Sequence, residues 1–171
     1  MRKLILIISA IASLQLAAQD HGNQELSSKM KSLQLLVGKW QGEGYIIDQS
    51  RQRTNFQQEE LIEYDLDSTI LSIEGVGKSD GKIVHHARAI ISPSDTSGKF
   101  EFYSFLSDGR KGKFTMKQEG EVIKWFIETE QGTIRYTITL SENNYHEIGE
   151  FGYGDGNWYP FLEMNLKRVK S

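Results

Sequence analysis

Gly38-Lys39-Trp40-Gln41-Gly42-Glu43-Gly44 begins the first of about ten short strand-like segments that follow one another to the end of the chain. Turn pairs such as Asp80-Gly81 and Asp108-Gly109 separate many of them and supply the positive φ that tight hairpins need. Because no long helical segment interrupts the series, parallel βαβ architectures are excluded. The predicted strands span roughly 39–48, 54–66, 69–77, 82–92, 98–107, 111–119, 121–130, 132–141, 143–153 and 157–169.

Alternation within these segments indicates which way the sheet faces. In 132–141, Ile134, Tyr136 and Ile138 share one face, and three threonines and Arg135 occupy the other, as in a strand with one apolar side. In 157–169, the predicted inner residues are Trp158, Leu162, Met164 and Leu166. Arg168 has the same parity as Leu166, so it is expected to point inward near the end of the barrel. A lone buried charge there needs a partner.

Trp40 in the first strand is the partner that we expect for Arg168. In a closed sheet the first and last strands are neighbours, and a guanidinium can then stack on an indole. We therefore predict an all-β fold: a single antiparallel up-and-down β-barrel of about ten strands. A barrel of that size has room for an internal cavity.

The N-terminus is expected to be a signal peptide over residues 1–18. Arg2-Lys3 forms a positive start, Leu4 to Ala12 is apolar, and Leu16-Ala17-Ala18 offers small residues for cleavage. The alternative, an uncleaved membrane anchor, is disfavoured because the apolar run is short for a bilayer span. Export to the periplasm or the outside of the cell is the expectation, with no stable membrane insertion after cleavage.

A polar lead-in and one short amphipathic helix are predicted for residues 19–36, before a barrel domain at 37–170. The helix prediction rests on apolar residues at helical spacing, namely Leu26, Met30, Leu33, Leu36 and Val37. Gly38 follows as a residue typical of a helix end. We expect this helix to cover one end of the barrel.

Composition excludes several function classes. The formal net charge is −3, and Lys and Arg are scattered, which argues against a nucleic-acid-binding surface. With no cysteine, the chain has no disulfide and no thiolate ligand. Because no known nucleophile, phosphate-loop or metal-protease motif occurs, we expect neither an enzyme nor a bound metal or cofactor.

Leu35-Leu36-Val37-Gly38-Lys39-Trp40-Gln41-Gly42-Glu43-Gly44 resembles the opening strand of the calycin superfamily, which includes lipocalins, fatty-acid-binding proteins and the haem-binding nitrobindins. In that superfamily a Gly-x-Trp begins the barrel, and a basic residue near the C-terminus packs on the Trp. The tail from Phe151 to Arg168 is similar to the closing hairpin of exported bacterial lipocalin-like domains. The likeness to nitrobindins is weaker: Tyr45-Ile46-Ile47 replaces their Tyr-Pro-Thr, and the closing strand lacks the histidine that ligates haem.

Five residues are candidates for a ligand site, on the expectation that they face the barrel interior: His85, Phe102, Phe114, Trp125 and Tyr136. The aromatic residues either line a pocket or fill a solid core. His85 is either a polar anchor for a ligand or a core histidine with a neighbouring partner. His86 is expected on the surface, and Glu59-Glu60 and Glu63 are interpreted as a solvated face.

The predicted function is that of an exported binding protein, which holds a small hydrophobic or amphipathic, lipid-like ligand in the barrel. The alternative is a structural or protein-interaction barrel with a solid interior. In that case exposed outer residues such as Val122 and Phe126 would make the contact, and a homodimer is one version of this alternative.

Overall fold

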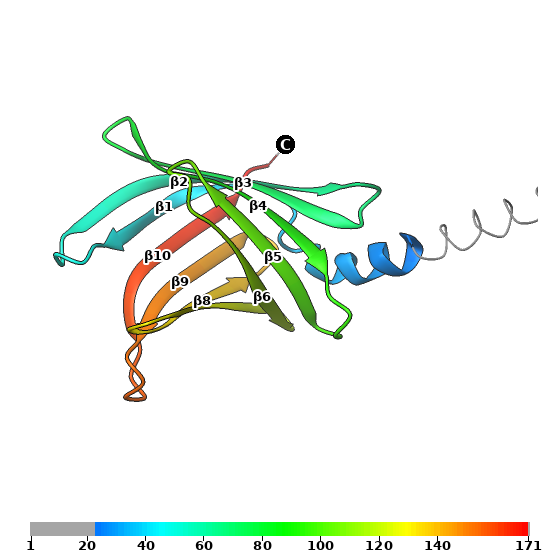
Figure 1. Cartoon of the computed structure of the whole chain (residues 1–171). Helices are drawn as coiled ribbons and strands as arrows, with labels where there is room; N and C mark the ends of the chain where they lie inside the picture. Colours follow the sequence, from blue (N-terminus) through cyan, green and yellow to red (C-terminus); the bar gives the residue numbers. More distant parts are fainter. Residues whose placement is uncertain (1–22, 171) are drawn as a thin grey trace, which may run out of the picture.

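The structure, a computed structural model, describes residues 23–170, so the predicted signal peptide lies outside the described residues. The strands are β1 (Gly38–Ile47), β2 (Arg53–Asp65), β3 (Ile70–Ser79), β4 (Lys82–Pro93), β5 (Lys99–Leu106), β6 (Lys111–Glu119), β7 (Val122–Thr129), β8 (Gly132–Leu140), β9 (Asn144–Gly152) and β10 (Tyr159–Arg168). Each strand pairs antiparallel with its neighbours in sequence, and β1 pairs with β10 to close the barrel (Figure 1). Within the described part, no helix is long and apolar enough to cross a membrane.

The prediction of a closed, up-and-down barrel of ten strands with one short helix is confirmed. Every strand boundary lies within two residues of the predicted one, which is the usual uncertainty of strand ends. Alternation and turn chemistry sufficed here because all pairings join strands adjacent in sequence, apart from the closing pair.

One end of the barrel is sealed by the N-terminal segment. Residues 23–30 are α-helical and continue into the 3₁₀ turn η1 (Lys31–Leu33), so the helix ends earlier than the pattern predicted. Met30, Leu33 and Leu36 are fully buried and join the same apolar core as the inward residues of the strands. In Figure 1 this helix lies at one end of the barrel, and the β1–β2 and β9–β10 hairpins project at the other.

Trp40 is the centre of the sealed end. Its indole is fully buried, and its Nε1 donates a hydrogen bond of 2.7 Å to the carbonyl of Leu36. The guanidinium of Arg168 lies 4.0 Å from the centroid of the indole ring, and Trp40 and Arg168 are register partners on β1 and β10. The indole thus contacts the helix side, the first strand and the last strand at once.

Arg168 also binds the segment that enters the barrel. Its Nη2 donates to the carbonyl of Leu35 at 2.8 Å, and its Nη1 donates to the carbonyl of Val37. Gly38 follows with a φ of 138°, and a β-carbon at that position would collide with the Arg168 guanidinium. A glycine is therefore required both for the backbone conformation and for the space that the arginine occupies.

A bulge in β10 corrects one expectation about the inner face. The register between β9 and β10 shifts between Pro160 and Leu162, so Phe161 is an extra residue in the strand. Trp158, which simple alternation placed inside, lies instead on the outer wall, where the Arg135 guanidinium stacks 3.9 Å from its ring centroid. One added residue reverses the side on which all earlier residues of the strand point.

Candidate functional site

A row of aromatic side chains lines the inner wall of strands β5 to β8. Trp125 and Tyr136 are stacked, with their ring centroids 4.1 Å apart and their planes 7° from parallel. Phe102 and Phe114 flank Trp125, with centroids 4.9 Å and 5.2 Å from its ring. The structure thus brings together four of the five predicted site residues, and we call these four the aromatic row.

The aromatic row remains accessible to solvent although it faces the barrel interior. All four residues are half-buried, whereas the next inward residue on each strand toward the helix end is buried. These buried neighbours are Phe100, Met116, Ile123 and Ile138. The interior is therefore filled near the helix, while solvent reaches the aromatic row from the opposite end, which we call the mouth.

Phe161 extends the aromatic row and was missed by the sequence analysis. Its ring lies edge-on to Tyr136, with centroids 5.9 Å apart. A β-carbon at Gly149 would come within about 3.1 Å of both rings, so the glycine leaves the space in which they meet. The bulge that displaces Trp158 is what brings Phe161 to this place, and alternation alone gave no signal of it.

His85 lies apart from the aromatic row, on β4 near the mouth. Its side chain faces the barrel interior beside Gly77 but remains exposed to solvent. Partial desolvation lowers the pKa of His85, and the positive charge of Arg110 lowers it further, while Asp108 opposes this. His85 is thus a neutral, accessible imidazole at neutral pH, next to an Arg110–Asp108 ion pair of 2.7 Å.

Two carboxyl groups and an amide are buried in the barrel wall, and the sequence analysis did not identify them. Glu60 and Gln58 lie on the inner face of β2, and Glu147 lies on the inner face of β9. The interpretation of Glu60 as part of a solvated face is wrong, although Glu59 and Glu63 are exposed as expected. The signal was present, because Gln58 and Glu60 alternate in step with Phe56 and Ile62.

These carboxyl groups have strongly perturbed protonation. Burial raises the pKa of Glu60 to about 8; the hydrogen bond from Gln58 opposes the shift, and the charge of Glu147 adds to it. Burial also raises the pKa of Glu147 to about 7, against a hydrogen bond of 2.8 Å from the Tyr145 hydroxyl. Desolvation raises the pKa of Tyr145 and Tyr136 as well, and the charge of Glu147 contributes to both. Such groups are able to exchange protons or accept hydrogen bonds near neutral pH.

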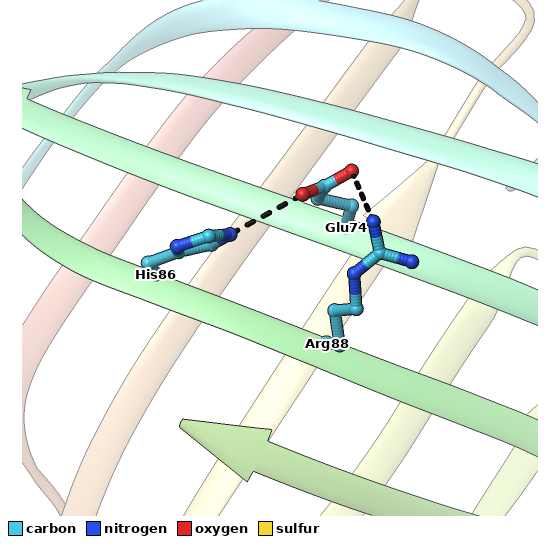
Figure 2. Close-up of polar contacts among 3 residues, drawn as sticks. All are labelled: Glu74, His86 and Arg88. Carbon is cyan, nitrogen blue, oxygen red and sulfur yellow. Dashed lines mark hydrogen bonds and ion pairs between the residues drawn. The ribbon is translucent and has the colours of Figure 1, made fainter. Parts of the chain in front are cut away.

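The remaining histidines of the described residues face outward. His86 lies 3.2 Å from Glu74, which also pairs with Arg88 at 2.9 Å (Figure 2). The hydrogen bond from His86, followed by the charge of Arg88, lowers the pKa of Glu74. His146 contacts Glu163 at 3.0 Å on the outer wall. Both histidines thus make polar contacts on the protein surface, where such contacts contribute little to stability.

The residues present do not fit a haem site of the kind that the likeness to nitrobindins implies. His146 points away from the interior, and the inner residues of β10 include no imidazole. Within residues 23–170, no group of three His, Cys, Asp or Glu side chains is arranged to hold a metal ion. The inner wall of the barrel, which we call the lumen, instead carries the aromatic row and the buried carboxyl groups of Glu60 and Glu147.

Known structures resemble this barrel. It matches a crystal structure of Rv2717c from M. tuberculosis with a TM-score of 0.67 and 14% identity, over 83% of this chain and 98% of that chain. It also matches the S-type phycobiliprotein lyase CPES from Guillardia theta, with a TM-score of 0.56 and 12% identity, over 81% and 90% of the two chains. No protein-family model and no curated protein matches the chain. At these identities the likeness shows the fold alone, which is a closed antiparallel β-barrel.

Proposed function

We propose that this chain is an exported small-molecule-binding protein that holds a hydrophobic or amphipathic ligand in its barrel. The observation that carries the proposal is the aromatic row, which faces inward and yet remains reachable from the mouth. Flat aromatic surface beside a few polar groups is the usual composition of a small-molecule site. The matches to barrels of known structure support the fold that such a site needs.

Uptake of a neutral fluorescent dye, Nile red, tests this function. We expect the protein to bind the dye, and Trp125→Ala to weaken binding by roughly tenfold because it removes the central ring of the aromatic row. Trp158→Ala is the matched control, since that indole lies on the outer wall. No dye uptake, together with repeatedly empty native mass spectra of freshly purified protein, would contradict the proposal; equal losses in both variants would place the dye elsewhere.

The competing function is a protein-interaction barrel. Val122 and Phe126, which we expected to be exposed, are half-buried. Ile90 and Phe105 are more exposed, and they lie on the outer wall of β4 and β5. They could form a contact between two copies of the chain, so the protein-interaction function is tested as a homodimer. Light scattering over a range of protein concentrations measures this association. A concentration-dependent dimer that takes up no dye would favour this function over ligand binding.

We infer binding rather than catalysis. The similar structure from Guillardia theta is named a lyase, and this is the observation that favours an enzyme. The two functions differ in the fate of the ligand. A compound that co-purifies with the protein and is recovered chemically unchanged after incubation supports binding, whereas its conversion supports an enzyme.

Export is inferred from the leader-like residues 1–18. We expect the protein from its native host to begin at or near Gln19, outside the cytoplasm, because Ala18 is a small residue of the kind that precedes signal cleavage. Intact-mass measurement of the purified protein checks this. A mass that includes residues 1–18 would contradict cleavage.

A further inference from the structure

One buried hydrogen-bond acceptor on the inner wall of the barrel has no donor within residues 23–170. Gln58 is 1% exposed, and its Oε1 is buried without any partner among the described residues. Its Nε2 donates to Oε1 of Glu60 at 2.7 Å, and the Tyr145 hydroxyl donates to Oε2 of Glu147 at 2.8 Å. An unsatisfied buried acceptor is costly, so the site is incomplete without a donor.

Glycines on β3 show that this arrangement is built into the wall. Gly75 and Gly77 are the register partners of Glu60 and Gln58. A β-carbon at Gly75 would lie 2.7 Å from Glu60 Oε1, and one at Gly77 would lie 2.7 Å from Gln58 Oε1. The two polar groups therefore lie in space that these glycines leave free on the inner face. We call Gln58, Glu60 and Glu147 the acceptor cluster.

The acceptor cluster is next to the aromatic row. Glu60 and Glu147 are close enough to interact electrostatically across the lumen, and Glu147 likewise interacts with Tyr136. Tyr136 is the register partner of Gly149, two residues along β9 from Glu147. Glu147 therefore follows Tyr136 on the inner wall, one inward position nearer the helix end and level with Ile138.

We propose that the ligand is an amphipathic amine, whose cationic nitrogen donates hydrogen bonds to the acceptor cluster while its apolar body lies on the aromatic row. This inference rests on the proposed function, since it names the ligand class for the same lumen. An ammonium group supplies several N–H donors and a positive charge, and it is stabilised both by carboxylates and by the faces of aromatic rings. A carboxylate head group would gain no such charge pairing, and it would be repelled by whichever of Glu60 and Glu147 is ionised.

The charged residues at the mouth do not reverse this preference. Arg110 is paired with Asp108 at 2.7 Å, so its charge is largely compensated. His85 has a lowered pKa and is neutral at neutral pH. The alternative ligand is an anion held by Arg110 and His85. Binding of dodecanoic acid in preference to dodecylamine would identify it.

Displacement of Nile red by dodecylamine, dodecanol and dodecanoic acid tests the proposal, because the three compounds share one tail and differ in the head group. We expect dodecylamine to bind at least tenfold more tightly than the other two. Glu147→Gln and Glu60→Gln should each weaken amine binding about tenfold and leave dodecanol unchanged. Glu63→Gln is the matched control, because Glu63 lies on the same strand as Glu60 but on the outer face.

The outcomes separate this inference from the proposed function. If all three compounds displace the dye equally, or if dodecanoic acid binds most tightly, the lumen binds ligands but the amine assignment is wrong. If dodecylamine is preferred and the two lumen variants bind it as the wild type does, the acceptor cluster is not its site. If the dye itself does not bind, the binding function fails first.

Discussion

Replacing Trp40 by alanine is expected to lower the free energy of unfolding by about 4 kcal/mol, the range found for a large aromatic side chain removed from a core. The indole is fully buried, and it is in contact with the helix segment, with β1 and with Arg168 on β10. Its loss leaves a cavity where β1 meets β10, and the guanidinium of Arg168 loses the ring on which it stacks. Urea unfolding followed by circular dichroism measures the change.

Trp158→Ala is the control for the effect of Trp40→Ala on the contact between β1 and β10. This residue is also a tryptophan stacked with an arginine, but it lies on the outer wall and is only half-buried. We expect it to cost about 1 kcal/mol, as for a partly exposed cation–π pair. Equal losses for the two variants would mean that closure of β1 on β10 does not depend on the buried indole.

Stability is expected to fall as the pH rises from about 4.5 to about 8, by a few kcal/mol at ~1.4 kcal/mol per unit of pKa shift. Burial raises the pKa of Glu60 to about 8 and that of Glu147 to about 7, from an unfolded value of 4.5. Between these values the unfolded chain releases protons that the folded chain retains, so unfolding becomes easier as the pH rises. Above about pH 8 both states are ionised and the dependence flattens.

The double variant Glu60→Gln/Glu147→Gln should remove most of this slope, because an amide keeps the shape and does not titrate. Glu63→Gln, on the exposed face of β2, should keep it. His85 acts in the opposite sense below about pH 6.5, since its lowered pKa makes the folded state gain stability as that imidazole deprotonates. Urea midpoints measured at intervals from pH 4.5 to 9 give the slopes. A wild-type curve that rises through this range would contradict the burial of these carboxyl groups.

The fold could be predicted from the sequence because short segments of sequence define each strand and each turn. Alternation and Gly-containing turns define each strand, and sequential antiparallel pairing then leaves few topologies. The closing pair was predictable from Trp40 and Arg168 because an inward charge at the end of the last strand needs a partner. The aromatic row followed from the same parity argument applied to β5 to β8.

The acceptor cluster was not predicted because a glutamate on a mixed strand is usually solvated, and that general expectation outweighed the parity of Glu60 with Phe56 and Ile62. The same expectation applies to Glu147, although it alternates in step with Tyr145 on the inner face of β9. The sides of the wall on which Trp158 and Phe161 lie could not be predicted. A bulge depends on how two strands pair, and alternation alone does not reveal it.

The helix of residues 23–30 and Arg168, whose guanidinium binds the carbonyl of Leu35, both lie at the sealed end of the barrel. A tether joined directly before this helix or directly after β10 therefore attaches opposite the entrance. The protein immobilised on a sensor surface, or fused to a carrier through either end, would keep its opening directed toward solution and free to capture molecules from it.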